Sequence, residues 1–407
     1  MDQYGLLGEK LGHSFSPQIH ALLGNYEYRL CEIDPAHLER FMRGRDLAGF
    51  NVTIPYKQAV IPYCEELSSQ AQAIGSVNTV IRRQDGTLFG DNTDYYGFSY
   101  LLAQSGAQLT GKKALVLGSG GAAKTDCAVL RKIGADPVIV ISRSGENHYG
   151  NLDRHTDAAL IVNTTPLGMY PDVGKAPVDL SLFVNKPAVI DLIYNPGMTE
   201  LLFQAEALDF PYVNGLPMLV AQAKKASELF QGKIIADKKI AEITETVSRK
   251  MRNVVLIGMP GSGKSTVGKR LAGLTGRDFY DTDEMIVREA GKSIPEIFAE
   301  DGETDFRRLE TQALAKAAKC SGIIIAAGGG VVCQPHNRKL IRQNSLAVFL
   351  ERELKLLPSE GRPLSQLRNI ADIYQERLPL YREWSDYTFV SADIEETARK
   401  IKEDLRL

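Results

Sequence analysis

One glycine-rich run has the residue types and spacing of a phosphate-binding loop. Gly258, Gly261 and Gly263 precede Lys264 and Ser265 in the order GxxxxGKS. In such a loop the backbone N–H groups surround the phosphates, the lysine reaches the β- and γ-phosphates, and the serine hydroxyl binds Mg²⁺. The run lies between an apolar segment and a helical pattern, so it predicts a binding site for a nucleoside triphosphate. It does not identify the second substrate, because GTPases, helicases and small-molecule kinases share this loop.

A second glycine cluster has the spacing of a dinucleotide-binding turn. Gly118, Gly120 and Ala123 give GxGxxA after an apolar run. The first glycine permits the tight turn, the second lets the backbone approach a pyrophosphate, and the small third residue packs helix against strand. An ordinary glycine-rich turn has the same composition. The next strand ends in Ser142 and Arg143, without the Asp or Glu that binds the ribose of NAD. This favours NADP, with a solvated loop arginine as the alternative.

Three polar segments in the first hundred residues could form a substrate site. His13 to Pro17 brings two hydroxyls together, Asn51 to Lys57 ends a short strand with a hydroxyl and an amine, and Gly90 to Asp94 carries a carboxylate after a turn. An amine beside a carboxylate can polarise a ketone that is being reduced and supply the proton it needs. Each segment alone also fits a serine cap, a surface lysine or an Asx turn.

Strands and helices must alternate to position these loops. Both glycine-rich loops connect an apolar strand to a helical pattern, which predicts parallel α/β sheets. Apolar residues recur at helical spacing from Ala236 to Val247, so we expect a helix over 235–250. The strand of the second loop begins near Asn253. The linker is therefore only a few residues long, and we place the domain boundary near Met251.

Composition limits the function classes. The 407 residues suit about two or three domains, and 48 Lys+Arg against 50 Asp+Glu give a formal net charge of −2. A nearly neutral chain is not expected to bind nucleic acid through its overall charge. Five widely spaced cysteines without a CxxC pair favour the cytoplasm over a disulfide framework or a cysteine zinc site. We expect no signal peptide and no membrane span, which would need an apolar run of ~20 residues.

Eight motifs give the first half of the chain a family resemblance: HSFSP, NVTIPYK, GSVNT, DNTD, GSGGAA, NTTPLGM, DLIYNPGMT and NGLPMLVAQA. In this order they resemble the shikimate dehydrogenase family, from residue 1 to about 248. The resemblance implies reversible NADP-linked reduction of 3-dehydroshikimate to shikimate, with Lys57 and Asp94 as the catalytic pair. It also implies two lobes, a substrate lobe of residues 1–97 plus 216–250 and a Rossmann NADP lobe of residues 98–215.

The same resemblance implies which residues bind the ligands. Those implied to bind the substrate are Ser14, Ser16, Thr53, Lys57, Asn78, Asp94, Tyr194 and Gln222. Those implied to bind NADP are Gly118, Gly120, Gly121, Ala122, Ala123, Ser142, Arg143, Ile193, Gly215 and Met218. The chain departs from the family where Gly145 and Glu146 replace a further basic residue, and the short stretch before NTTPLGM leaves a helix trimmed. The strength of the NADP preference and a side activity on quinate stay open.

The second half resembles shikimate kinase over about 252–407. Its motifs after the phosphate-binding loop are DTD (281–283), DFRRLE (305–310), GGG (328–330), GRPL (361–364) and RLPLY (377–381). The resemblance implies that Arg307 and Arg377 bind the shikimate carboxylate with the Gly329 backbone. Asp283 would orient the attacking hydroxyl, and Glu310 would anchor the arginines.

The kinase resemblance also implies a nucleotide set. The residues implied to bind ATP are Gly258, Gly261, Ser262, Gly263, Lys264, Ser265, Thr266 and Arg362. Lys264, Asp283 and Arg362 would be catalytic, and Ser265 and Asp281 would lie at Mg²⁺. The expected lid, Glu353 to Gly361, is short and lacks the arginine that family members often carry over the adenine.

We therefore expect a bifunctional α/β enzyme of the shikimate pathway. Residues 1–250 would be the two-lobed dehydrogenase, and residues 251–407 a P-loop, nucleoside-monophosphate-kinase-like domain. The expected ligands are 3-dehydroshikimate, shikimate, NADP(H), ATP and Mg²⁺, in a monomer or homodimer without nucleic acid or membrane partners. Two alternatives remain. One half could be an inactive module that only binds its ligand, although both catalytic sets are intact. The chain could also be a P-loop NTPase with a redox-sensing lobe.

Overall fold

The computed structural model describes residues 3–12, 14–170, 172–357 and 369–407. The chain divides into two compact units, Met1–Val247 and Ser248–Leu407. The division falls inside α8 (Lys238–Met251), a continuous helix that ends just before the first strand of the second unit. The helix expected over 235–250 thus begins slightly later than the apolar spacing suggested, and the boundary placed near Met251 coincides with its end.

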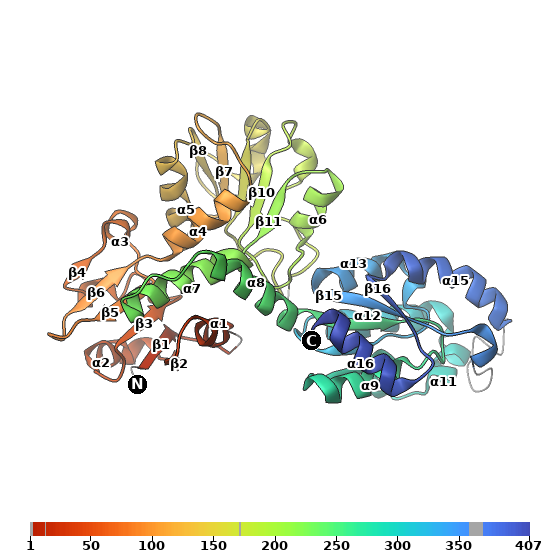
Figure 1. The fold of residues 1–407 in the computed structure, drawn as a ribbon. Helices are drawn as coiled ribbons and strands as arrows, with labels where there is room; N and C mark the ends of the chain where they lie inside the picture. The colour runs from red at the N-terminus through yellow and green to blue at the C-terminus, as the bar shows by residue number, and fades with distance from the viewer. Residues whose placement is uncertain (1–2, 13, 171, 358–368) are drawn as a thin grey trace. The chain divides into compact units, whose positions relative to one another are not determined.

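The first unit begins with a mixed sheet. Its elements are β1 (Gln3–Gly8), α1 (Ser16–Leu23), β2 (Glu27–Glu32), η1 (Pro35–His37), α2 (Leu38–Arg43), β3 (Gly49–Val52), η2 (Ile61–Tyr63), β4 (Glu66–Leu67), α3 (Ser69–Ile74), β5 (Thr79–Arg82) and β6 (Leu88–Asp91). Among the described residues the sheet has six strands in the order β2-β1-β3-β5-β6-β4. β1 is parallel to β2 and β3, whereas β5 is antiparallel to β3 and β6. β3, labelled in Figure 1, ends with the first two residues of the NVTIPYK segment, Asn51 and Val52.

A parallel sheet follows in the same unit. Its elements are α4 (Asp94–Gln104), β7 (Ala114–Leu117), α5 (Gly121–Lys132), β8 (Val138–Ile141), η3 (Tyr149–His155), β9 (Leu160–Asn163), η4 (Leu180–Leu182), β10 (Ala188–Asp191), α6 (Glu200–Ala207), β11 (Tyr212–Asn214) and α7 (Leu216–Gln231). The five described strands run in the order β11-β10-β9-β7-β8. Only the 3₁₀ segment η3 lies between β8 and β9, where the sequence suggested a trimmed helix.

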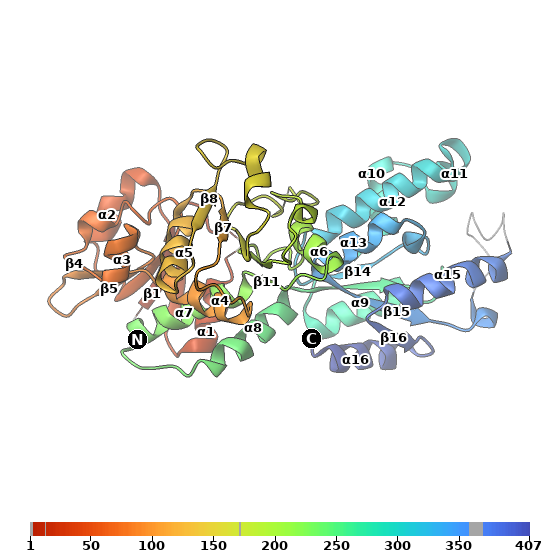
Figure 2. The same ribbon diagram turned by 90° about the horizontal axis from the view of Figure 1, so that it is seen from above.

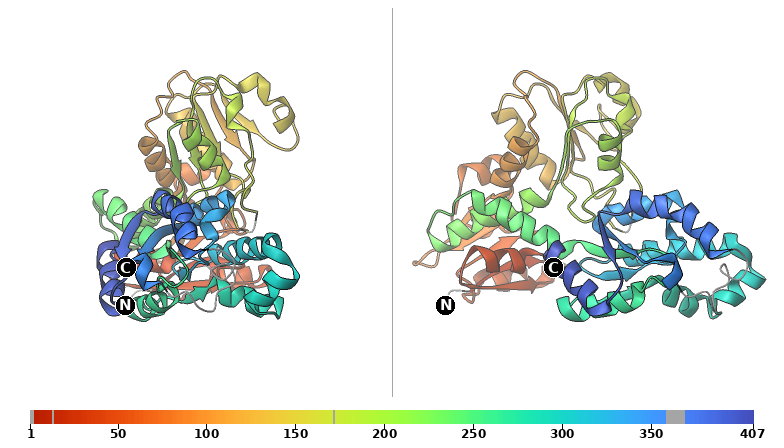
Figure 3. Two further views of the ribbon diagram at one scale, coloured as in Figure 1. Left: turned by 90° about the vertical axis from the view of Figure 1, so that its right-hand side faces the viewer. Right: turned by 45° about the vertical axis from the view of Figure 1, so that its right-hand side comes forward.

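Side-chain alternation along β7 explains how this sheet is covered. Ala114 and Val116 pack under α4 and α5, whereas Leu115 and Leu117 face α6 and the 3₁₀ segments. α7 packs along α4 and also against α1, and its Phe230 stacks on Tyr4 of β1. Figure 3 shows α7 between the two sheets of this unit. This helix therefore contacts elements that belong to both sheets of the unit.

The second unit is a parallel sheet with helices on both faces. Its elements are β12 (Asn253–Ile257), α9 (Lys264–Thr275), β13 (Phe279–Asp281), α10 (Thr282–Ala290), α11 (Ile294–Glu300), α12 (Gly302–Ala318), β14 (Ile324–Ala326), η5 (Val331–Cys333), α13 (Pro335–Asn344), β15 (Ser345–Glu351), η6 (Leu354–Leu356), α15 (Ile370–Trp384), β16 (Tyr387–Val390) and α16 (Ile394–Leu405). The five described strands run in the order β13-β14-β12-β15-β16.

Strand alternation again assigns the helices to faces. Val254 and Leu256 of β12 pack against α9 and α16, whereas Val255 and Ile257 pack on the side of α12, α13 and α15. Figure 2 shows α10, α11 and α12 close together at the upper right, on one side of the second unit. The mixed α/β fold with parallel sheets confirms the predicted fold class. In the described ranges no helix is long and apolar enough to cross a membrane, and the five cysteines, all in these ranges, form no disulfide.

Candidate active sites

A cleft of about 600 Å³ lies between the two sheets of the first unit. Most of the predicted substrate and nicotinamide residues line it: Ser14, Ser16, Thr53, Lys57, Asn78, Asp94, Ala122, Tyr194, Gly215, Met218 and Gln222. They come from the loops after β1, β3 and β10, from the residue before β5, from the starts of α1, α4 and α5, and from α7 with the residue before it. Segments more than two hundred residues apart in the sequence thus meet around one cavity.

Lys57 and Asp94 form the charged centre of this cleft. The Nζ atom of Lys57 lies 2.6 Å from Oδ2 of Asp94, and their side chains are 26% and 16% exposed. Asp94 is the first residue of α4, where the helix dipole favours a carboxylate. Behind the pair, Asp126 of α5 is fully buried, and both its carboxylate oxygens lack a partner among the described residues. Burial, with Asp94 nearby, raises the pKa of Asp126 well above its usual value.

Asn78 is held by hydrogen bonds that fix the orientation of its amide. Its Oδ1 accepts from the Thr93 backbone N–H at 2.7 Å and from the hydroxyls of Thr93 and Thr79 at 3.1 Å each. The amide NH₂ is therefore the group that Asn78 can offer to a ligand. Gln222 of α7 approaches the same place, because Thr93 also donates to its Oε1 at 3.5 Å. The arrangement can bind several hydroxyls of a small polar molecule beside an ammonium–carboxylate pair.

The predicted dinucleotide loop lies where the order of the parallel strands reverses. β7 feeds this loop and has β8 on one side and β9 on the other, which is the crevice that binds nucleotides in such sheets. Gly118 has φ +106, and a Cβ there would lie 2.7 Å from the Thr164 hydroxyl. An added Cβ at Gly120 or Gly121 would meet nothing of the described protein within 4 Å. This free space at the start of α5 fits a pyrophosphate, and the exposed Arg143 follows β8 as expected.

A buried carboxylate shapes the loop that carries Tyr194. Asp191 at the end of β10 accepts from the Thr199 hydroxyl at 2.7 Å, the Asn163 amide at 3.0 Å and the Ile193 backbone N–H at 3.1 Å. Burial raises the pKa of Asp191 to about 6, although these donors oppose the shift. These bonds connect the NTTPLGM segment, through Asn163, with both ends of the DLIYNPGMT segment. Tyr194, in the loop between Asp191 and Thr199, lines the cleft.

Not every predicted residue lines the first cleft. Ile193 is buried next to it and is not one of its lining residues. Ser142 and Arg143 lie on the loop after β8, outside the cavity. The sequence analysis also missed lining residues, notably Lys10, Asn51 and Leu192. Asn51 opens the NVTIPYK motif and could have been found there, whereas a single lysine or leucine carries no comparable signal.

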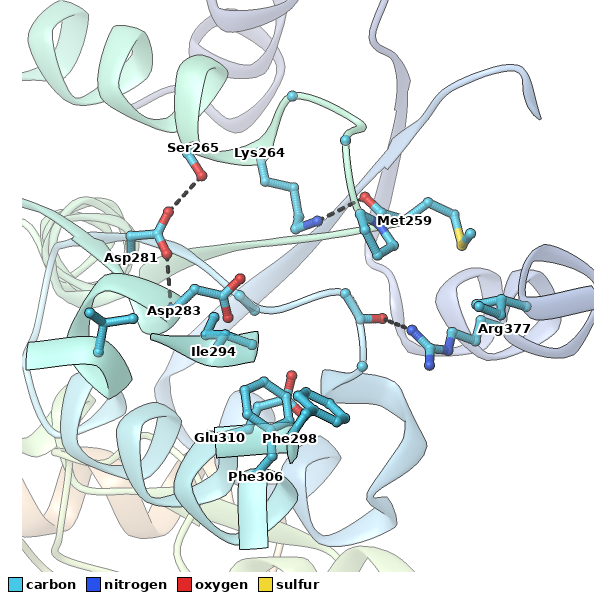
Figure 4. A pocket seen from close by; sticks show the side chains of 18 of the residues that line it. Met259, Lys264, Ser265, Asp281, Asp283, Ile294, Phe298, Phe306, Glu310 and Arg377 are labelled. Atoms are coloured by element: carbon cyan, nitrogen blue, oxygen red, sulfur yellow. Dashed lines mark hydrogen bonds between the residues drawn. The ribbon is translucent and has the colours of Figure 1, made fainter. Parts of the chain in front are cut away.

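A cleft of about 650 Å³ lies at the carboxyl edge of the sheet in the second unit. From the phosphate-binding loop it is lined by Gly261, Gly263, Lys264, Ser265 and Thr266, and from the predicted acceptor site by Asp281, Asp283, Arg307, Glu310, Gly329 and Arg377. Gly258 and the buried Ser262 belong to the loop without lining the cavity. Figure 4 shows Lys264, Asp283 and Arg377 converging on this pocket from three different elements.

The loop and the edge of β13 are joined by an oxygen-rich contact. The Ser265 hydroxyl donates to Oδ2 of Asp281 at 2.6 Å, and Oδ1 of Asp281 caps α10 by accepting from the Asp283 N–H at 2.9 Å. A hydroxyl beside a carboxylate is the donor set that Mg²⁺ prefers. Lys264 donates to the backbone carbonyls of Gly258 and Met259 at 2.9 Å each.

The three glycines after β14 are required by close approaches. A Cβ at Gly328 would lie 2.4 Å from Oε1 of Glu310, and one at Gly330 would lie 1.7 Å from Nη1 of Arg307. A Cβ at Gly329 would lie 2.6 Å from the Pro260 ring of the phosphate-binding loop. Only glycine lets the backbone pass between the arginine, the carboxylates and the loop. The GGG run therefore passes close to both the arginine–carboxylate cluster and the phosphate-binding loop.

Two guanidinium groups and one carboxylate face the remaining space. Nη1 of Arg307 binds Oε2 of the buried Glu310 at 2.7 Å, and Nη1 of Arg377 donates to the Gly329 carbonyl at 3.0 Å. Burial, together with the nearby Asp281 carboxylate, raises the pKa of Asp283 to about 6. Two cations opposite a weakly basic carboxylate can hold an anionic molecule by its carboxylate and accept a proton from one of its hydroxyls.

Some expected parts of the second site are not placed. Arg362 and the end of the expected lid lie outside the described residues, while its start is η6. The sequence analysis missed the apolar residues Ile294 and Phe298 of α11, and it missed Arg352, which follows β15 and lines the pocket. These positions belong to no motif. Tertiary packing brings α11 and the end of β15 to the pocket, and the sequence around them does not indicate it.

Comparisons with known proteins match each half separately. Family models match the shikimate dehydrogenase substrate binding domain over residues 6–80 and shikimate kinase over residues 260–406. A shikimate dehydrogenase (NADP(+)) of Clostridium beijerinckii is 38% identical over 250 residues, which make up 57% of this chain and 92% of that enzyme.

Solved structures give the same assignment for the first half. The chorismate mutase/shikimate 5-dehydrogenase fusion protein from Clostridium acetobutylicum aligns with a TM-score of 0.57 and 36% identity, covering 61% of this chain and 97% of that chain. Shikimate 5-dehydrogenase from Thermus thermophilus, in complex with NADP(H) and shikimate, aligns with a TM-score of 0.55 and 31% identity, covering 60% of this chain and 99% of that chain. The chain therefore belongs to the shikimate dehydrogenase family, as a fusion in which an NADP-dependent shikimate dehydrogenase is followed by a shikimate kinase domain.

Proposed function

We propose that this chain catalyses two consecutive reactions, NADPH-dependent reduction of 3-dehydroshikimate to shikimate and ATP-dependent phosphorylation of shikimate to shikimate 3-phosphate. The observation that carries the proposal is that one chain holds two polar clefts, each with a cluster of charged side chains. One has the Lys57–Asp94 pair at its centre, and the other has two arginines and Asp283 beside a phosphate-binding loop. The product of the first reaction is the substrate of the second, so the two halves of the chain would catalyse consecutive steps.

The dehydrogenase step follows from the contacts in the first cleft. NADPH, when bound at the β7–α5 loop, supplies the hydride. The hydroxyls of Ser14 and Ser16 bind the substrate carboxylate, and Thr53, Asn78 and Gln222 bind its hydroxyls. As the ketone becomes an alkoxide, the Lys57 ammonium stabilises the oxygen and gives it a proton. Asp94, 2.6 Å from Lys57, holds that amine in position.

The cofactor contacts belong to the same proposal. Gly118, Gly120, Gly121, Ala122 and Ala123 hold the pyrophosphate against the start of α5. Ser142 and Arg143 bind the 2′-phosphate, and Gly215 and Met218 flank the nicotinamide. The space above Gly120 and Gly121 supports this placement. Ile193 supports the nicotinamide side of the cleft from its buried position.

The kinase step follows from the second cleft. Arg307 and Arg377, with the Gly329 backbone, hold the shikimate carboxylate. Asp283 then accepts the proton of the attacking hydroxyl, while Lys264 and Arg362 neutralise charge on the transferring phosphoryl group. Mg²⁺, when bound near Ser265 and Asp281, supplies further positive charge at the phosphates, and this hydroxyl–carboxylate pair fits it.

The domain limits are proposed with the function. Residues 1–250 would form the dehydrogenase, with residues 1–97 plus 216–250 as substrate lobe and residues 98–215 as NADP lobe, and residues 251–407 would form the kinase. We propose the cytoplasm as the site of action, because the two proposed reactions use NADPH and ATP and the five widely spaced cysteines suit a reducing compartment.

Two assays on one preparation test the proposal. Shikimate-dependent NADP⁺ reduction reports the first site, and shikimate-dependent ADP release reports the second. We expect both activities, with Lys57→Ala strongly lowering only the first and Asp283→Asn strongly lowering only the second. If one activity is absent while its ligand still binds, that half is a binding module. ATP turnover that does not depend on shikimate would contradict the kinase assignment.

A further inference from the structure

Arg352 lies beside the phosphate-binding loop, at the end of a neighbouring strand of the sheet. It directly follows β15, the neighbour of β12, and β12 ends in the loop itself. The two segments are in close contact, because a Cβ at Gly258 would lie 2.7 Å from the carbonyl oxygen of Leu350. Nη1 of Arg352 donates to the Gly261 carbonyl at 3.2 Å, and the side chain lines the pocket. No motif or expected role accounts for this residue.

The charge of Arg352 is not neutralised by its neighbours. Glu351 on one side pairs with Arg382 at 2.9 Å, and Glu353 on the other pairs with Lys355 at 2.6 Å. Within the described ranges Arg352 has no carboxylate partner, and its buried Nε has no hydrogen-bond partner. A half-buried guanidinium without a counter-charge is costly, and a bound anion would remove that cost.

Arg352 and Lys264 are placed on the loop in the same way. Lys264 donates to the carbonyls of Gly258 and Met259, and Arg352 donates to the carbonyl of Gly261. The N–H groups of this loop face the phosphates. Two cations that touch one phosphate-binding loop and line one pocket can act on one polyanion. A planar guanidinium adds a two-pronged contact that an ammonium cannot make.

We propose that Arg352 is a nucleotide-binding residue that contacts the phosphate chain of ATP from the end of β15. The inference rests on the proposed kinase function for its substrate. Binding of a nucleotide to the loop can nevertheless be measured without shikimate. We expect Arg352 to contact phosphate and not the adenine ring, because its guanidinium binds the carbonyl of Gly261, which belongs to the phosphate-binding loop.

The test compares Arg352→Met and Arg352→Lys with Arg382→Ala in the full chain. Arg382 is 60% exposed and pairs with Glu351, so its variant removes one positive charge near the same strand end without lining the pocket. Steady-state phosphorylation gives KM for ATP, KM for shikimate and kcat. Titration with a fluorescent ATP analogue, and its displacement by ATP, ADP and adenosine, gives affinities without catalysis. Thermal unfolding and dehydrogenase activity check that the chain is folded.

Arg352→Met is expected to raise KM and Kd for ATP about 10–100-fold, the range for losing a hydrogen bond to a charged group. KM for shikimate and the weak binding of adenosine should stay within about twofold, and Arg352→Lys should recover part of the loss. Arg382→Ala should leave ATP binding unchanged. Unchanged ATP affinity in a folded Arg352→Met variant, an equal loss in Arg382→Ala, or an equal loss for adenosine would overturn the proposal. If the wild type binds the analogue but does not phosphorylate shikimate, the kinase function fails while this test still gives its answer.

Discussion

Replacing Asp283 with asparagine should make the kinase unit more stable and nearly inactive. The carboxylate is held in a half-buried position, where burial and the neighbouring Asp281 raise its pKa from 3.8 to about 6. Because the folded-state pKa lies above the unfolded one, the stability contributed by this group is complete below about pH 4. It is lost as the pH rises through about 6. At neutral pH the ionised carboxylate therefore destabilises the unit by on the order of 3 kcal/mol, which asparagine should recover.

The chain has a built-in reporter for this measurement. Its single tryptophan, Trp384, is buried in the core of the second unit, so tryptophan fluorescence during urea unfolding follows that unit alone. We expect a higher unfolding midpoint for Asp283→Asn than for the wild type at pH 7, and a gap that closes toward pH 4. Glu284→Gln is the matched control, because Glu284 is the next residue of α10 and its side chain is 66% exposed.

Activity should move in the opposite direction. Asp283→Asn removes the group that accepts the hydroxyl proton, so kcat/KM for shikimate should fall by about 10²–10⁴-fold. In the wild type, kcat/KM should decline below about pH 6 as Asp283 becomes protonated. Dehydrogenase activity of the same chain should not change. A variant with unchanged or lower stability at pH 7, or with normal phosphorylation, would refute the reasoning that this carboxylate is kept at the cost of stability for catalysis.

Three further predictions address the other parts of the chain. Lys57→Ala removes the proton donor 2.6 Å from Asp94 and should lower dehydrogenase kcat by ~10²–10⁴-fold. The kinase rate of the same variant is the control, and an equal fall in both activities would count against two separate sites. Arg143→Glu places a like charge at the 2′-phosphate, so kcat/KM for NADP should fall while that for NAD holds or rises, and an unmoved ratio would make Arg143 a solvated loop residue. Residues 1–250 and 251–407, expressed separately and mixed in equal amounts, should keep most of both activities. They should also form shikimate 3-phosphate with the same lag as the fused chain; a shorter lag in the fusion would demonstrate channelling.

The two nucleotide loops could be predicted because their chemistry is local. GxxxxGKS and GxGxxA are defined by neighbouring residues, and the strand before and the helix after each loop follow from apolar spacing within a short window. The α/β class, the short link near Met251 and the trimmed helix after β8 are local properties of the same kind. That the remaining segment is a 3₁₀ helix was seen only in the structure. The GGG run could also be recognised as a motif. The sequence could not show that Glu310, Arg307 and Pro260 approach its three glycines.

Only the tertiary structure decided which distant groups meet. Lys57 and Asp94 lie on different elements, and nothing in their spacing requires the 2.6 Å contact. Asp126 belongs to no motif, and its isolation behind that pair results from the packing of α5 beside α4. Arg352 reaches the phosphate-binding loop because the sheet order places β15 beside β12. The physical reason is the same in each case. Sheet order and helix packing set the distances between remote residues, whereas sequence patterns report on positions a few residues apart.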